Sequence, residues 1–148
     1  MNLDETPDEL HFIDSNVFFY SIILDGNYGR SCAEVLRKLQ DGTILGATSS
    51  LVILEVANAL RKFGLAKQVR DVVDSVFSLE IKILDMTSSD VRNATEICQR
   101  LNINPYDCIH VAVMQHAGIK RIISADRDFD RISEIKRTDP KSFFTNSN

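Results

Sequence analysis

Several residue types that often carry specialised roles are scarce in this chain of 148 residues. It has no tryptophan, three cysteines, three prolines and six glycines. Cys32, Cys98 and Cys108 are odd in number, lack metal-site spacing, and each falls in an apolar helical pattern. We therefore expect reduced core thiols in a cytoplasmic protein, rather than a disulfide framework. With so few glycines there is no Gly-rich phosphate loop, and residues 26–29 (GNYG) indicate a plain turn.

Long apolar runs and an excess of basic residues are lacking as well. No apolar run approaches the roughly 18 residues of a membrane-spanning helix. The first nine residues are acidic, whereas a signal peptide starts with basic residues. The net charge of −4 and the pI near 5.3 do not suggest a nucleic-acid binder. Acids buried at a site would subtract from that total without facing a polyanion, so local basic residues matter more.

The rest of the composition, 44% hydrophobic and 26% charged, is that of an ordinary soluble globular protein. The length suits one domain with a single sizeable core. We expect a flexible N-terminal segment at 1–9, one domain at 10–144 and a frayed tail at 145–148.

Strand-like and helix-like patterns alternate along the chain. Strand-like runs occur at 12–13, 44–47, 81–84 and 121–123, and Ile135 could begin a last edge strand. Helical patterns occur at 17–24, 32–39, 52–63, 69–76, 87–101 and 104–114. This alternation predicts a three-layer α/β/α sandwich with a central parallel sheet of about four or five strands. In such sheets, ligands bind beyond the carboxyl ends of the strands, at the topological switch point.

Four acidic residues stand where a carboxylate is costly unless it has a partner. Asp14 and Asp126 each follow an apolar strand-like run, Glu55 lies on the apolar stripe of a helix, and Asp107 lies near the start of an almost entirely apolar helix. If the fold brings them together, like charges about 4 Å apart repel by roughly 4 kcal/mol per pair at an effective dielectric of about 20. A fold keeps such a cluster only by protonating some members or by binding cations. The sequence therefore points to a metal site.

Each of these acids also has a purely structural explanation. Asp14 could cap the helix that follows it, and Asp107 stands three residues after Asn104, where an acid completes a capping box. Glu55 could reach water at the edge of its stripe and pair with a nearby base. Asp126 lies in a charged turn, where solvated acids are common.

The spacing of the three histidines does not predict a zinc site. No two of them stand four residues apart with a third metal ligand nearby. We therefore expect structural or surface roles for His11, His110 and His116. A carboxylate-only cluster is a hard oxygen site that suits Mg²⁺ or Mn²⁺ rather than Zn²⁺. Such ions activate water and offset charge on a phosphate, so no nucleophilic side chain is required.

The four acids lie in segments that occur in a fixed order, at 12–18, 54–60, 106–112 and 123–129. These read FIDSNVF, LEVANAL, YDCIHVA and ISADRDF, and together they resemble the PIN domain, a family of metal-dependent nucleases that includes the VapC toxins of toxin–antitoxin pairs. The resemblance spans nearly the whole chain. It implies a metal-binding and catalytic quartet formed by Asp14, Glu55, Asp107 and Asp126. Asn16 and Ser124 would support this quartet, and Asp128 would be an auxiliary acid.

The resemblance also implies what the protein does. A PIN-like member would be an endoribonuclease that hydrolyses RNA phosphodiester bonds with Mg²⁺ or Mn²⁺ held by the quartet, and it could be the toxin of a toxin–antitoxin pair. Implied partners are a second copy in a homodimer and, for a VapC-type member, a small antitoxin that covers the site. Basic residues bordering the site would hold the RNA backbone, and the candidates are Arg61, Lys62, Arg127 and Arg131.

Other functions fit the sequence less well. A non-catalytic PIN scaffold that binds RNA or protein would bind metal without cleaving RNA. A structure-specific DNA nuclease is disfavoured because no helical arch or DNA-binding insertion fits within 148 residues. A phospho-receiver domain needs an acidic pair after its first strand and a lysine after its fifth. Here Asp14 has no adjacent acid, and the run at 121–123 is followed by Ser124.

Overall fold

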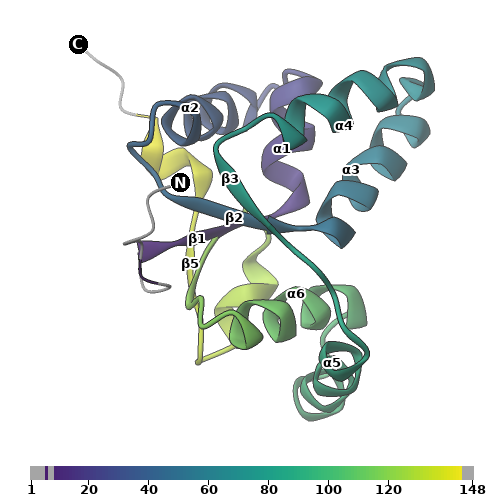
Figure 1. Ribbon diagram of the computed structural model, residues 1–148, viewed down its shortest axis with the longest axis vertical. Helices are drawn as coiled ribbons and strands as arrows, with labels where there is room; N and C mark the ends of the chain where they lie inside the picture. Colours follow the sequence, from purple (N-terminus) through teal and green to yellow (C-terminus); the bar gives the residue numbers. More distant parts are fainter. Residues whose placement is uncertain (1–5, 7–8, 145–148) are drawn as a thin grey trace.

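The computed structural model describes residue 6 and residues 9–144 (Figure 1). The expected flexible segment at 1–9 and frayed tail at 145–148 therefore fall almost wholly outside the described residues. Among the residues that the structure does describe, no helix is long and apolar enough to cross a membrane.

A central sheet of five strands, all parallel, organises the molecule. The strands are β1 (His11–Ile13), β2 (Gly46–Ser49), β3 (Ile81–Leu84), β4 (Arg121–Ile123) and β5 (Lys136–Thr138). Their order in the sheet is β3-β2-β1-β4-β5, so the first strand of the chain lies in the middle.

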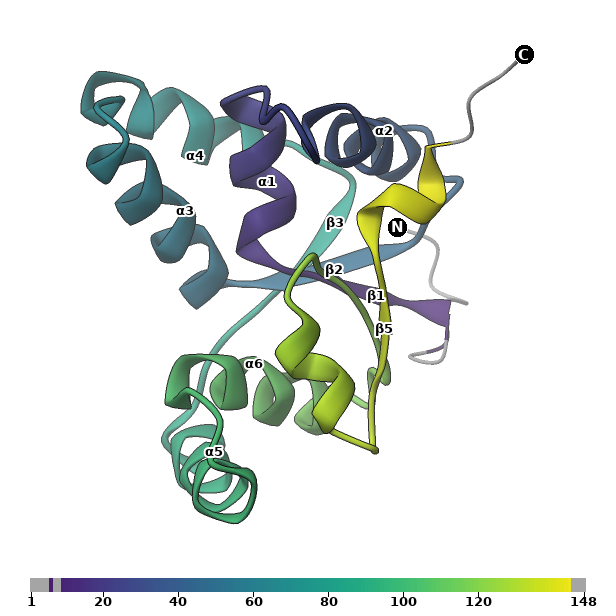
Figure 2. The same ribbon diagram turned by 180° about the vertical axis from the view of Figure 1, so that it is seen from behind.

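Helices cover both faces of this sheet. They are α1 (Ser15–Ile22), α2 (Gly29–Gln40), α3 (Ser50–Lys62), α4 (Val69–Phe77), α5 (Ser88–Leu101) and α6 (Pro105–His116). Figure 1 shows α1–α4 on one side of the sheet and α5 and α6 on the other, and Figure 2 shows the same division from behind. The short 3-10 helices are η2 (Ala66–Gln68), η3 (Arg127–Arg131) and η4 (Pro140–Phe143). The expected three-layer α/β/α sandwich is confirmed.

Local capping signals fix where the helices begin. Thr87 and Asp90 form a reciprocal capping box at the start of α5. Asn104 caps α6, accepting a hydrogen bond from the second helical N–H, and Pro105 occupies the first helical position. The hydroxyl of Ser49 caps α3. In each case a polar residue stands just before an apolar periodic run, which is the pattern that predicts a helix cap.

Two elements are displaced from their expected positions. Strand β2 occupies 46–49 rather than 44–47. Its last two residues are polar yet buried, because the Thr48 hydroxyl donates to the Ile13 carbonyl at 2.8 Å and the Ser49 hydroxyl serves as a helix cap. Helix α1 ends at Ile22 rather than 24, since Leu24 adopts a left-handed φ of 50° that cannot continue a helix.

The sheet order places the switch point beside β1. The chain runs from β1 to β2 and β3 on one side, then crosses back to β4 and β5 on the other. Ile13 and Ile123 are register partners in the parallel β1–β4 pair and are both fully buried. The residues after them therefore emerge side by side at the same edge of the sheet, where parallel α/β folds bind their ligands.

Candidate metal centre

Asp14 directly follows β1 and is 4% exposed. Its Oδ1 atom accepts a hydrogen bond from the Ser15 N–H at 2.8 Å, which caps α1. Its Oδ2 atom accepts from Asn16 Nδ2 at 3.1 Å and from Ser124 Oγ at 2.6 Å. The carboxylate is therefore held both from the start of α1 and from the end of β4, so one side chain caps the helix and forms part of the site.

Asn16 and Ser124 tie the ends of β1 and β4 together. Asn16 Nδ2 donates to Ser124 Oγ at 3.0 Å, and Asn16 Oδ1 accepts from the Ala125 N–H at 3.1 Å. Ser124 Oγ also accepts from the Asp126 N–H at 3.0 Å. This network fixes the backbone that presents Asp126.

Asp107, Asp126 and Asp128 form an acidic cluster next to Asp14. One carboxylate oxygen of each lies within 4.8 Å of the others. Asp126 caps η3 by accepting the Asp128 N–H at 2.9 Å. Burial raises the pKa of Asp107 to about 7, and repulsion from Asp126, Asp14 and Asp128 adds to the rise. Asp107 therefore lies in the electrostatic field of these three acids.

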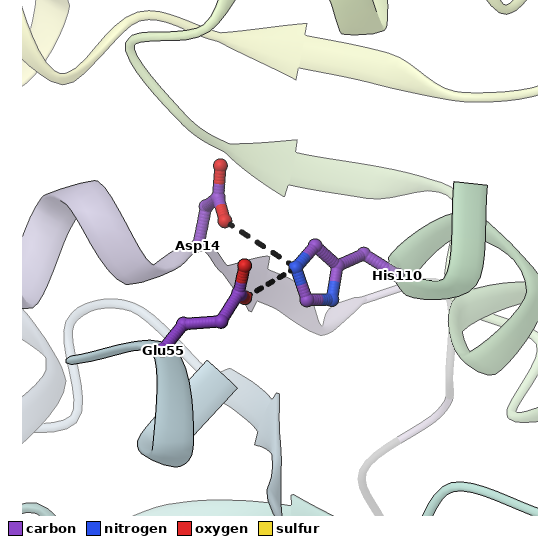
Figure 3. A group of neighbouring side chains, drawn as sticks. All are labelled: Asp14, Glu55 and His110. Carbon is purple, nitrogen blue, oxygen red and sulfur yellow. Dashed lines mark ion pairs between the residues drawn. The ribbon is translucent and has the colours of Figure 1, made fainter. Parts of the chain in front are cut away.

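Glu55 and His110 complete the site on the side of α3 and α6. His110 Nε2 lies 2.6 Å from Glu55 Oε1 and 4.0 Å from Asp14 Oδ1 (Figure 3). The imidazole is 1% exposed and the Glu55 side chain 29% exposed. Burial lowers the His110 pKa, but the contact with Glu55 and the charges of Asp14 and Asp107 outweigh it, so the net shift is upward.

The short contact between Glu55 and His110 is an ion pair by distance but not a well-aligned hydrogen bond. Glu55 Oε1 and both ring nitrogens of His110 are buried without a hydrogen-bond partner among the described residues. Close approach without alignment leaves lone pairs free to take a further ligand. The two side chains are therefore close neighbours whose bonding capacity is still unmet.

The structure thus brings all four acids of the sequence quartet to one edge of the sheet, together with Asn16, Ser124 and Asp128. Sequence reasoning missed His110, for which a structural or surface role was expected. The available signal was its position three residues after Asp107, which puts both side chains on the same face of one helix.

The four basic residues expected near RNA lie in different settings. Arg127 directly follows Asp126 and is exposed. Arg61 and Lys62 are exposed in the last turn of α3, and Arg61 bonds the Asn58 side chain. Arg131 donates to the Leu101 carbonyl, which is a contact within the fold. Of the four, Arg127 has the position closest in sequence to a site acid.

The donor atoms fit a divalent cation. The three-residue groups Asp14–Glu55–His110 and Asp107–Asp126–Asp128 each offer ligand atoms within 4.8 Å of one another. Glu55 Oε1 and the ring nitrogens of His110 are buried and lack hydrogen-bond partners among the described residues, so they have bonding capacity that an ion would satisfy. Carboxylate oxygens are the usual ligands of Mg²⁺ and Mn²⁺.

Comparison with known proteins gives a consistent result. The sequence profile of the PIN domain matches residues 11–135. The chain is 25% identical over 126 residues to a VapC ribonuclease of Mycobacterium bovis, covering 84% of this chain and 96% of that protein. The same figures hold for ribonuclease VapC13 of Mycobacterium tuberculosis.

Solved structures share the fold at lower identity. VapC20 of Mycobacterium tuberculosis, described as a toxin that cleaves the sarcin–ricin loop, superposes with a TM-score of 0.70 at 16% identity, covering 84% of this chain and 95% of that one. VapBC2 of Rickettsia felis, solved bound to a DNA fragment from its promoter, gives a TM-score of 0.67 at 18% identity, covering 88% and 98%.

Proposed function

This chain belongs to the PIN domain family, and from that membership we propose that it is a metal-dependent endoribonuclease that acts as the toxin of a toxin–antitoxin pair. The observation that carries the proposal is the convergence of five carboxylates and one imidazole at the switch point of the sheet. Named relatives that match over 126 residues are ribonucleases, which supports RNA as the substrate.

Each side chain has a definite task in this proposal. Asp14, Asp107 and Asp126 hold Mg²⁺ or Mn²⁺, and Asn16 and Ser124 keep Asp14 in place. When bound, the ions activate water and offset the charge of the scissile phosphate. Glu55 would bind an ion together with Asp14 or orient the attacking water, and its side chain is more exposed than those of Asp14 and His110.

RNA would be held by local positive charge, since the protein as a whole is acidic. Arg127 is exposed and adjacent to Asp126, which supports a contact with the phosphate next to the cleaved bond. Arg61 and Lys62 are exposed about two turns beyond Glu55 on α3, where they could contact a more distant phosphate. Arg131 is the weakest candidate because its guanidinium already bonds the Leu101 carbonyl.

An antitoxin partner and a homodimer belong to the same proposal. Structures with this fold include VapBC toxin–antitoxin complexes from Salmonella typhimurium and nontypeable Haemophilus influenzae. Next to Glu55, Leu54 and Tyr106 are 66% and 63% exposed. They line a shallow groove of about 340 Å³ together with Leu51 and Asn58. An apolar surface beside a charged site supports a protein partner that covers it.

The test is RNA cleavage by the purified protein with Mn²⁺ or Mg²⁺ added to chelator-treated samples. Wild type should cleave only with metal, and Asp126→Asn should lower the rate by orders of magnitude because a metal ligand is lost. Asp74→Asn is the matched control, since Asp74 is an exposed acid on α4 that pairs only loosely with Arg70. Metal binding without cleavage in wild type would favour the non-catalytic scaffold.

A further inference from the structure

His110 does not fit a site made only of carboxylates. Its ring is 1% exposed and comes from the middle of α6, a helix whose residues 108–114 are all buried. A histidine that only filled space here would cost free energy, because its two ring nitrogens are polar and lack hydrogen-bond partners among the described residues. The ring therefore calls for a ligand or an ion that satisfies it.

The orientation of the ring shows where that ligand would lie. Figure 3 shows the ring pointing between the two carboxylates, one of its nitrogens facing Asp14 and Glu55. That atom, Nε2, is 4.0 Å from Asp14 Oδ1 and 2.6 Å from Glu55 Oε1. Ligands of one six-coordinate ion at about 2.1 Å lie about 3 Å apart when adjacent and about 4.2 Å apart when opposite. The observed spacing is close to that of one coordination shell.

From this geometry we propose that His110 Nε2 is a direct ligand of the ion held by Asp14 and Glu55, so that this ion has a mixed nitrogen and oxygen shell and Mn²⁺ binds there in preference to Mg²⁺. The inference rests on the proposed metal-dependent function. The second group, Asp107, Asp126 and Asp128, offers oxygen alone.

Selectivity follows from the chemistry of the donors. Mg²⁺ binds oxygen ligands and gives up water reluctantly, so an imidazole nitrogen adds little to its affinity. First-row transition ions gain from nitrogen donors, and Mn²⁺ is the transition ion that also accepts carboxylates well. Replacing His110 should therefore weaken Mn²⁺ binding and leave Mg²⁺ binding nearly unchanged.

A competing explanation is that His110 serves only as a cation between Glu55 and Asp14. In that case its ring would never touch the metal, and its loss would affect both ions alike by changing the charge of the site. The two explanations differ in a signal that can be measured directly, the magnetic coupling between Mn²⁺ and a coordinated imidazole nitrogen.

The experiment uses the whole chain loaded with one and with two equivalents of Mn²⁺ and electron spin-echo envelope modulation to detect ¹⁴N coupling. Wild type and His116→Asn should show coupling, and His110→Asn should not. His116 is the matched control because it lies at the end of the same helix, 62% exposed, and pairs with Asp90 rather than with the site acids. Calorimetric titration should show Mn²⁺ affinity falling at least about tenfold in His110→Asn, since even losing a group that only supports a ligand costs about 10- to 100-fold.

Wild-type spectra without ¹⁴N coupling at either loading would overturn the inference, even if the His110 variant does not fold. Equal losses of Mn²⁺ and Mg²⁺ affinity in His110→Asn would overturn it too. The proposed function fails separately: a wild-type protein that binds neither ion and cleaves no RNA contradicts both, whereas cleavage with Mn²⁺ and no nitrogen coupling contradicts only the role of His110.

Discussion

At the scale of single residues, the Ser124 side chain connects three other residues of the site. Its hydroxyl donates to Asp14 and accepts from both Asn16 and the Asp126 N–H. A hydroxyl has one proton and two lone pairs, so every bonding position of this fully buried group is used. No other small side chain offers that combination without adding a methyl group to a packed position.

Ser124→Ala should therefore lower the free energy of unfolding by about 1–3 kcal/mol, because the half-buried Asp126 N–H and Asn16 Nδ2 both lose an acceptor. Denaturant unfolding measures this. Ser78→Ala is the control, since Ser78 is exposed and only bonds the Ser75 carbonyl, and it should change stability by less than about 0.5 kcal/mol. An equal change in the free energy of unfolding in the two variants would show that the hydrogen bonds of Ser124 contribute no more to stability than that of an exposed serine.

The raised pKa of Asp107 predicts that the stability of the metal-free protein depends on pH. Its pKa rises to about 7 when folded, chiefly through burial and then through Asp126 and Asp14, whereas an unfolded Asp has a pKa of about 3.9. A raised folded pKa gives stability that is complete below the unfolded value and is lost as pH rises towards 7. Metal-free wild type should therefore lose thermal stability between about pH 4 and pH 7, and Asp107→Asn should lose less. Parallel melting curves against pH would contradict the assignment.

At the scale of elements, Arg137 on β5 holds the segment that carries Asp126 and Asp128. Its guanidinium donates to Ser124 O at 3.0 Å and makes a two-pronged contact with Asp130 at 2.9 and 3.0 Å. The side chain is 10% exposed. Arg137 thus bonds both ends of the segment that runs from Ser124 to Asp130.

Arg137→Lys should weaken metal binding by about tenfold, because a lysine keeps the charge but cannot bridge both ends of the segment. Titration calorimetry with Mn²⁺ measures the affinity. Arg100→Lys is the control, since Arg100 is 57% exposed and pairs with Glu134 on the surface, and it should leave metal affinity unchanged. If Arg137→Lys binds Mn²⁺ with wild-type affinity, the contacts of Arg137 are not needed to position Asp126 and Asp128.

The elements also show what the sequence could and could not predict. Caps and apolar periodicity were enough for α5 and α6, because those signals are local. Strand β2 was placed two residues early because its buried Thr48 and Ser49 look like turn residues until their partners in β1 and α3 are known. His110 was missed for a related reason: apart from Asp107 its neighbours within α6 are apolar, and the carboxylates of Asp14 and Glu55 that lie near its Nε2 atom come from elsewhere in the chain.

At the scale of the whole molecule, the acids hold mutually repelling charge at one edge of the sheet. A bound cation relieves that repulsion and binds only the folded protein, so it stabilises the fold by mass action. At a free concentration 100 times the dissociation constant the gain is about 2.7 kcal/mol.

Millimolar Mn²⁺ should accordingly raise the melting temperature of wild type and raise that of Asp14→Asn much less. Thermal unfolding with and without metal measures both. Asp14→Asn also exchanges a carboxylate that accepts from Ser15, Asn16 and Ser124 for an amide, so its metal-free stability provides the baseline for the comparison. A rise of the same size in both proteins would locate the stabilising ion elsewhere.

The central place of β1 has a consequence for synthesis of the protein. His11 pairs with Arg121, so the strand made first completes its pairing only after most of the chain has left the ribosome. Asp126 and Asp128 come later still. The full set of acids can therefore form only after β4 and the residues that follow it have been made. A chain that stops before β4 would lack both the central pairing of the sheet and the two acids Asp126 and Asp128 of the proposed metal site.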